Sequence, residues 1–330
     1  MTIPSRRSIL RTAVLAVVVL SLPIGGGTVV AQEQPETAGE YFNTLRSMEG
    51  MAVFEEYGEL ETIHARSLTE VQVGEFTAAE RQKLDAVIGL LRSFSNASSL
   101  VENGNYRAAF REAERIDGYI DTLNEHDETY GVLATLALTR FYENLGNKLA
   151  SRADQVERTP VEIELRSMAA TAYKRANEPE QAAEFIRQSE RLEAEYEADL
   201  AFMNETASQA RSFLERCSGC TGAVSAIGAK GLDVFGLYET AREHHRDAVD
   251  ARNRASRHGL SERAQTFATL ASDTGAVWGA LAIASVVLVL GYGLVVGLIA
   301  SLVVWRVFTW EETFVAASVD SVVAMGDSDV

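Results

Sequence analysis

The residues from Thr274 to Trp305 form a run of 32 positions without a charged side chain. As an α-helix, which rises 1.5 Å per residue, this run would be about 48 Å long, whereas the hydrocarbon core of a bilayer is about 30 Å thick. Two spans do not fit, because each would have about 16 residues and no polar turn separates them. The sequence therefore predicts one long transmembrane helix at 274–305, either tilted or protruding from the membrane.

Two tryptophans lie near the ends of this run. Trp278 and Trp305 are 27 residues apart, which corresponds to about 40 Å of helix and to the distance between the two headgroup regions of a bilayer. Because indole rings prefer those regions, we expect both tryptophans to act as interface anchors.

Small residues recur every four positions within the run. Gly293, Gly297 and Ser301 share one helix face, and Gly275 and Gly279 repeat the same spacing. Such a face lets another helix backbone approach closely. We expect it to pair with a second copy of the chain or with another membrane subunit, the alternative being that glycine is simply common in spanning helices.

The amino-terminal residues 1–31 have the layout of a secretory signal: a basic start, an apolar run at 12–24 and small residues before residue 32. Arg6 and Arg7 are followed by one residue of any kind and then by two apolar residues. This segment resembles the twin-arginine export motif, although Arg11 stands where that motif often has lysine. The resemblance implies export of an already folded protein, and a general secretory peptide is the alternative.

The orientation of the chain follows from its ends. An exported amino terminus places residues 32–273 outside the cell, and Arg306 directly follows the apolar run with no further basic residue in the tail 306–330. Basic residues next to a span favour the cytoplasmic side. The sequence thus predicts a single-pass protein of the cell membrane with an extracytoplasmic body and a cytoplasmic tail.

The chain is strongly acidic, with 47 acidic and 30 basic side chains and a formal charge of −17. The basic residues of the signal, Arg306 and the acidic residues of the tail leave the body at 32–273 with a charge of −16. This charge argues against a nucleic-acid binder, which needs a basic face. Only four of the basic residues are lysines, and the composition resembles that of proteins from salt-loving archaea, whose surroundings screen such charges.

The body has the pattern of an all-α fold. Its long stretches between the few prolines lack the strongest helix breaker, strand-like alternation is nearly absent, and apolar residues recur with helical spacing. We expect eight to ten helices with short connections. The apolar positions expected to face a core include Leu84, Val87, Ile88 and Leu91, then Leu133, Leu136, Ala137 and Phe141, then Phe213 and Leu214, and finally Leu232, Phe235 and Tyr238.

Two segments of the body predict helical hairpins with small residues where the helices cross. The first hairpin joins Ala97 and Leu100 to Tyr106, Ala109, Ala113 and Ile116 across a turn at Gly104. The second joins Ala170 and Tyr173 to Ala182, Ile186 and Ser189 across Asn177 and Pro179. A poorer middle copy contains Thr139, Tyr142 and Ser151, with its turn expected at Gly146.

These hairpins resemble tetratricopeptide repeats over about a hundred residues. The turns are separated by 42 and 31 residues, whereas the family repeats every 34. The resemblance implies an irregular superhelix of hairpins with a concave protein-binding groove, and it does not imply catalysis. A plain antiparallel helical bundle would need the same small residues, so both architectures remain open.

The chain has two cysteines, Cys217 and Cys220, at a spacing used by dithiol oxidoreductases and metal sites. No strand pattern lies nearby, and Ala207 to Arg216 looks like the end of a helix, so we expect a local disulfide that pins a turn, with a redox-active dithiol as the alternative. His244 and His245 are the nearest further ligands. Adjacent helical residues point about 100° apart, so we predict no metal site and expect these histidines on a solvated face.

Asn96 and Asn204 begin triplets that can accept N-linked glycans in an exported protein. No nucleophile elbow, phosphate loop or paired-carboxylate pattern of the common enzyme classes is present, and nothing predicts a cofactor. We therefore expect a non-enzymatic, membrane-anchored extracytoplasmic scaffold that binds a partner protein or organises a membrane complex. The alternatives are a thiol redox protein using Cys217 and Cys220, and an accessory or sensor subunit of a membrane complex.

Overall fold

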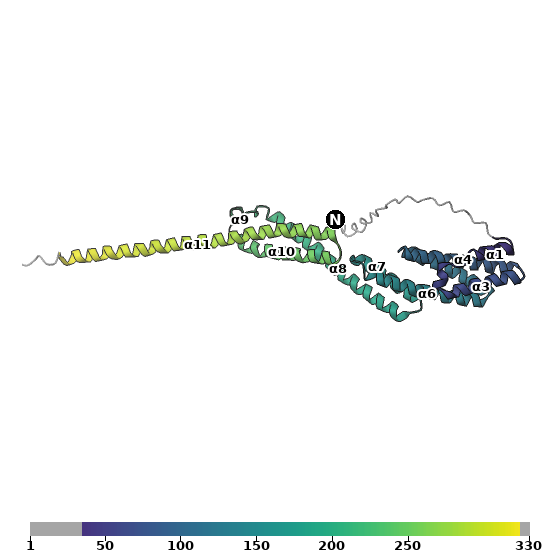
Figure 1. Ribbon diagram of the computed structural model, residues 1–330. Helices are drawn as coiled ribbons and strands as arrows, with labels where there is room; N and C mark the ends of the chain where they lie inside the picture. Colours follow the sequence, from purple (N-terminus) through teal and green to yellow (C-terminus); the bar gives the residue numbers. More distant parts are fainter. Residues whose placement is uncertain (1–34, 324–330) are drawn as a thin grey trace, which may run out of the picture.

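The computed structural model describes residues 35–323, and within this range the chain is built from eleven α-helices and one short 3-10 helix, with no strand. The expected all-α fold is confirmed, with two of the helices, α2 and α9, no longer than eight residues. The molecule is elongated: helices α1 to α7 lie at one end, and a single long helix runs out at the other (Figure 1). Arg6, Arg7 and the predicted signal lie outside the described residues.

The end of the molecule farthest from that long helix is a stack of consecutive helices, here called the distal module (residues 38–189). Its elements are α1 (Ala38–Arg46), α2 (Ala52–Glu56), α3 (Gly58–Val73), α4 (Ala78–Glu102), α5 (Tyr106–His126), α6 (Glu128–Ala153), α7 (Thr159–Arg175) and the first part of α8 (Pro179–Arg216). From α4 onward each helix packs against the next one along the chain. The first and the second of the expected hairpins are therefore present here, α4 with α5 and α7 with α8.

Local signals in the sequence set the ends of these helices. The Thr37 side chain accepts a hydrogen bond from the Glu40 backbone N–H at 3.3 Å and so caps α1. Asp127 caps α6 in the same way, accepting from the Thr129 N–H at 2.9 Å. Gly104 and Asn177 adopt positive φ angles of 72° and 58°, which end α4 and α7 and allow the chain to reverse.

The middle hairpin is wrong. Gly146 was expected at its turn, yet it lies inside α6. A Cβ at Gly146 would come within 3.0 Å of the Tyr173 ring on α7, so this glycine serves the close packing of two helices and not a reversal of the chain. A glycine that admits a neighbouring ring cannot be told from a turn glycine without the tertiary structure.

The second hairpin is formed, but with a shifted contact. Tyr173 was expected to meet Ile186, which is instead 44% exposed. Phe185 takes that place, and its ring stacks on the Tyr173 ring with the centroids 5.4 Å apart. Neighbouring residues on a helix point about 100° apart, so Ile186 is turned towards solvent.

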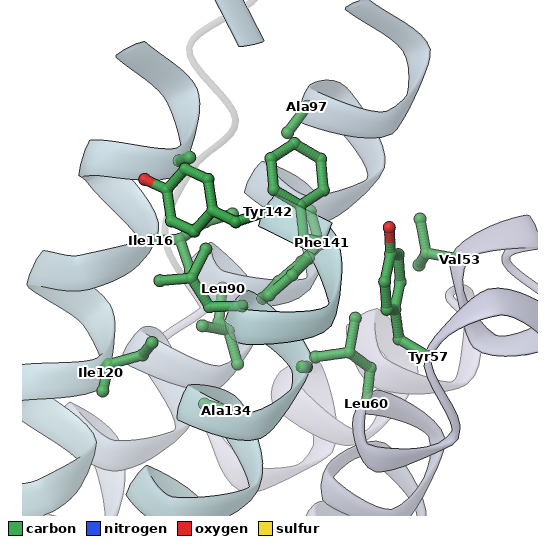
Figure 2. Packing of buried hydrophobic residues seen from close by; sticks show 14 of the residues in the cluster. Val53, Tyr57, Leu60, Leu90, Ala97, Ile116, Ile120, Ala134, Phe141 and Tyr142 are labelled. Atoms are coloured by element: carbon green, nitrogen blue, oxygen red, sulfur yellow. The ribbon is translucent and has the colours of Figure 1, made fainter. Parts of the chain in front are cut away.

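Aromatic rings fill the core of the distal module. The Phe94 ring of α4 meets the Phe141 ring of α6 edge-on at 6.3 Å, and Tyr57, just before α3, contacts both. Figure 2 shows Phe141 and Tyr142 reaching between Tyr57 and the α4–α5 hairpin that carries Ala97. Ala97 is fully buried, as the small-residue crossing predicts. Edge-on contacts of this kind add to the free energy gained by burying the rings.

The second half of the body is a stalk (residues 190–285) made by the rest of α8, α9 (Ala223–Lys230), the 3-10 helix η1 (Gly231–Asp233), α10 (Val234–Arg257) and the first part of α11 (Ser261–Val323). On α8 and α11 most of its buried residues are spaced alternately by three and four, which is the pattern of a left-handed coiled coil. The series on α8 is Met203, Thr206, Ala210 and Phe213, continued after its end by Cys217 and Cys220, and the series on α11 is Phe267, Leu270, Thr274, Val277, Leu281 and Ala284, beside which Ala271 and Ala280 are also buried. On α10 the buried residues are Val234, Ala241, Ala248, Ala251 and Ala255, and His258 follows its end. Three helices thus share two apolar clusters.

Candidate functional site

Helix α11 is one of the three long helices of the stalk. It is also the one described helix that is long and apolar enough to cross a membrane. Its last fully buried residue is Ala284. From Val286 onward the large apolar side chains are exposed around the helix, except for Leu288, which is half-buried and still packs on the stalk. Val286 to Trp305 is 20 residues, about 30 Å of helix, which equals the thickness of a hydrocarbon core. The uncharged run is longer than a membrane because its first part, 274–285, packs inside the stalk.

The prediction that both tryptophans act as interface anchors is therefore wrong for Trp278. Trp278 is half-buried in the stalk, where its ring stacks on the His245 ring with centroids 5.6 Å apart and also faces Tyr238. Trp305 is 63% exposed on the free part of α11. An apolar, aromatic sequence serves a protein core and a membrane interface equally well, so the sequence alone did not separate the two.

The small residues of α11 fall into two groups. A Cβ at Gly275 would come within 3.1 Å of the His245 ring, so this glycine admits the neighbouring helix α10 of the same chain. Gly293 and Gly297 lie on the free part, where an added Cβ would meet nothing within 4 Å, and Ser301 follows on the same part. The coiled-coil spacing continues through Gly291, so Gly293 and Gly297 fall outside that seam.

A disulfide closes the end of the stalk from which α11 continues alone. Cys217 follows the last residue of α8, and its sulfur is joined to that of Cys220 across a Cα–Cα distance of 5.2 Å. The two residues are 1% and 0% exposed and belong to the same cluster as Phe213 and Val234. A cross-link at this position fixes the direction in which the chain leaves α8.

The two histidines of α10 were expected on a solvated face, and this prediction is wrong. The His244 ring packs against the Phe213 ring at 5.1 Å, and His245 Nδ1–H donates to the carbonyl oxygen of Ala271 at 2.9 Å. Both side chains are half-buried between α10 and its neighbours. Within residues 35–323 no group of three or more histidine, cysteine or acidic side chains is arranged to hold a metal ion.

A buried polar network joins the stalk to the distal module, and the sequence analysis missed it. His258 donates through Nε2–H to the Asp199 carboxylate at 2.9 Å, and its Nδ1 lies 2.9 Å from the Thr159 hydroxyl at the start of α7. Arg254 donates to the other oxygen of Asp199. We call these four residues the junction. The available signal was an acid at 199 and a histidine at 258, both in register with apolar seam positions.

The electrostatics of the junction favour the charged form of Asp199. Burial alone would raise the pKa of its carboxyl, but the hydrogen bonds from His258 and Arg254 outweigh this effect and lower the pKa below its usual value. The nearby turn between α10 and α11 is equally constrained, because Gly259 has a φ of 64° and a Cβ there would lie 2.8 Å from the carbonyl oxygen of Glu157. Stalk and module are thus held by both charge and shape.

The distal module carries a surface hollow of about 520 Å³ between α1, α4 and α5. Its lining is polar and of mixed charge, with Asp85, Arg92 and His126 among the side chains. Asp85 accepts a hydrogen bond from the Tyr41 hydroxyl at 2.6 Å, and burial raises the pKa of that hydroxyl. Within the described chain Arg92 makes no ion pair, so its charge is available to a ligand.

The predicted glycan acceptors are both accessible. Asn96 is exposed on α4 and Asn204 is exposed on α8, and the Asn204 side-chain oxygen accepts a hydrogen bond from Arg263 at 3.4 Å. Each lies inside a helix and points away from the core, so neither site requires a change in the packing.

Comparison of the chain with models of known protein families, with curated protein sequences and with solved structures gave no significant match. The resemblances to a twin-arginine signal, to tetratricopeptide hairpins and to proteins of salt-loving archaea therefore stay predictions.

Proposed function

We propose that this protein is a single-pass membrane scaffold that carries a helical module on a coiled-coil stalk. The observation that supports this function is the continuity of α11, which has fully buried residues in the stalk up to Ala284 and is apolar and exposed from Val286, apart from a last stalk contact at Leu288. A soluble protein would leave about 30 Å of apolar helix in water at high cost in free energy. Lipid removes that cost.

The dimensions fit a spacer. The part of α11 inside the stalk, Ser261 to Ala284, spans about 36 Å, and the junction ties its far end to the distal module. The module is thereby held at a fixed distance from the membrane. A protein partner would meet it there, and the hollow that contains Arg92 is the surface we propose for this contact, because its mixed charges suit a polar protein segment better than an apolar ligand.

The remaining parts of the proposal concern location. Export by the twin-arginine route, supported by Arg6 and Arg7, would place the module outside the cell, and Arg306 after the span would hold the tail in the cytoplasm. Pairing of the span through Gly293 and Gly297 would add a second copy or another membrane subunit.

Two alternatives differ in what favours them. A redox role needs a sulfur that a thiol can attack, and the burial of both Cys217 and Cys220 favours a structural disulfide instead. A sensor role is favoured by the unbroken α11 helix, which would transmit a movement of the stalk into the span. We keep the sensor as the second candidate function.

Alkaline extraction of membranes tests the anchoring. The full chain should stay with the lipid fraction, because its span is buried in hydrocarbon, whereas a chain ending at residue 285 should be released and remain helical by circular dichroism. Release of the full chain by alkali would contradict the proposal. Retention of the shortened chain would show that some other part of the protein holds the membrane.

A further inference from the structure

We propose that α9, the 3-10 turn after it and the first turn of α10 rest on the surface of the membrane that α11 crosses, with Val224, Leu232 and Phe235 in contact with lipid. This inference rests on the single-pass anchoring proposed above. It adds a second, peripheral membrane contact to the stalk.

The three side chains are exposed without a protein partner that would explain them. Val224 is 85%, Leu232 78% and Phe235 42% exposed. The spacing in the sequence predicted that Leu232 and Phe235 face a core, and that prediction is wrong. They are the large apolar side chains that the described chain exposes between Ile186 and Ile283, so the stalk gathers its exposed apolar surface in one place.

That place is the level at which α11 leaves the stalk. On its inner side α9 contributes Ala226 and Ile227 to a cluster that also contains Leu281 and Ala284 of α11. The next residues of α11, from Val286, are those assigned to the hydrocarbon. Figure 1 shows α9 beside α11 at the end of the stalk from which α11 continues alone. The exposed side chains therefore lie where the headgroups of the bilayer would be.

The charge of this segment fits a lipid surface. Residues 217–238 are 22 positions with two charged side chains, Lys230 and Asp233, and a net charge of zero. The body as a whole is strongly acidic, and acidic groups are repelled by anionic lipids. Lys230 ends α9, and a lysine side chain can lay its methylenes on apolar surface while its ammonium reaches a phosphate.

The disulfide gives the segment its rigidity. A helix of eight residues is marginal in water by itself, yet α9 is tied to the end of α8 through Cys217 and Cys220 and packed on α11 through Ala226. The exposed residues are thus presented in one fixed orientation. Such a rigid apolar patch favours the bilayer as its occupant, because α11 brings that bilayer to the patch without any further partner.

Photocrosslinking to lipid tests the contact in the full chain. p-Benzoylphenylalanine would replace Val224 or Leu232, one at a time, and the protein would be irradiated in vesicles of equal parts phosphatidylcholine and phosphatidylglycerol. We expect the intact mass of each variant to rise by that of one lipid. Val73, 82% exposed on α3 of the distal module, is the matched negative position, and Leu294 in the span is the positive one.

The outcomes separate this inference from the proposed function. If positions 224 and 232 give no more lipid adduct than position 73 while position 294 reacts, the inference is overturned and the anchoring stands. Crosslinks from 224 or 232 to a second copy of the chain in place of lipid would also overturn it. If position 294 gives no adduct either, the anchoring itself fails.

Discussion

At the residue scale, the junction shows how a few polar groups can set the geometry of a long molecule. Asp199 lies in the middle of α8, the helix shared by the distal module and the stalk, and it gathers His258 and Arg254 of α10 while His258 reaches Thr159 of α7. Buried charges of this kind contribute stability only when every partner is present, because an unpaired one keeps its desolvation cost.

Replacing Asp199 by asparagine should destabilise the protein by about 1–3 kcal/mol at neutral pH, because it removes the negative charge that Arg254 and His258 face. The pH dependence follows from the lowered pKa of Asp199. A carboxyl whose pKa is lower in the folded state contributes stability above its unfolded pKa of about 3.9, and loses it as the pH falls through the folded pKa.

Denaturant unfolding of the full chain in detergent, measured at pH 7 and again below pH 4, checks this prediction. The difference in the free energy of unfolding between the wild type and Asp199→Asn should be smaller below pH 4 than at pH 7. Glu190→Gln, at an exposed position of the same helix, is the control and should change little. Equal effects of the two substitutions at neutral pH would show that the junction does not stabilise the fold.

Gly89 is a second residue whose effect can be predicted. A Cβ at this position of α4 would lie 2.4 Å from the Tyr119 ring on α5, so Gly89→Ala must push the hairpin apart and should cost about 1–3 kcal/mol. Gly118→Ala on α5 meets nothing within 4 Å and should be neutral or stabilise the helix by up to about 1 kcal/mol. Thermal unfolding of both variants compares them, and a Gly89→Ala protein as stable as Gly118→Ala would contradict the packing of α4 on α5.

At the element scale, α11 is apolar along its whole uncharged run but lies in two environments, the stalk and the free part. Most of its buried positions in the stalk follow the three-four spacing from Phe267 to Ala284, and the same helix then continues with mostly exposed apolar residues. The spacing of the stalk positions could have been found in the sequence, because coiled coils carry a strict repeat. The end of the stalk could not, since nothing in the run 274–305 changes at residue 285.

The glycines of the free part test whether α11 pairs with another helix. Replacing Gly293 and Gly297 together by isoleucine keeps the segment apolar, so insertion should survive, but the bulk prevents a close approach of backbones and should weaken association. Crosslinking in membranes measures the oligomer. Gly291→Ile, on the seam side of the same segment, is the control and should leave it unchanged. If the double variant forms the same oligomer as the wild type, Gly293 and Gly297 do not mediate association, and the body at 32–273 must do so.

At the scale of the whole molecule, local signals predicted much of the architecture. The all-α fold, the turns at Gly104 and Asn177 and the single long apolar helix follow from proline placement, glycine chemistry and hydropathy, which act over a few residues. The errors concern tertiary partners. Gly146 admits Tyr173, and His245 and Trp278 pack on each other between α10 and α11, relations that no local pattern contains.

The division of the body into a module and a stalk also needed the structure. The sequence left open whether the helices form a superhelix of hairpins or a bundle, and the molecule contains both: consecutive hairpins from α4 to α8 and a three-helix coiled coil from α8 to α11. The continuous α8 connects them, so neither description of the whole chain would have been sufficient.

The central claim is that residues 286–305 of α11, and not 274–305, cross the membrane. Nitroxide labels placed at successive positions from 279 to 309 in vesicle-bound protein measure it directly, through their accessibility to oxygen relative to a water-soluble nickel complex. We predict that the accessibility to oxygen relative to nickel is low up to residue 285 and rises from residue 286. It should reach a maximum near residue 295 and fall towards residue 305. A hydrocarbon signal that is already present at residue 279, as a span from 274 would give, or an aqueous signal along the whole helix, would contradict the account.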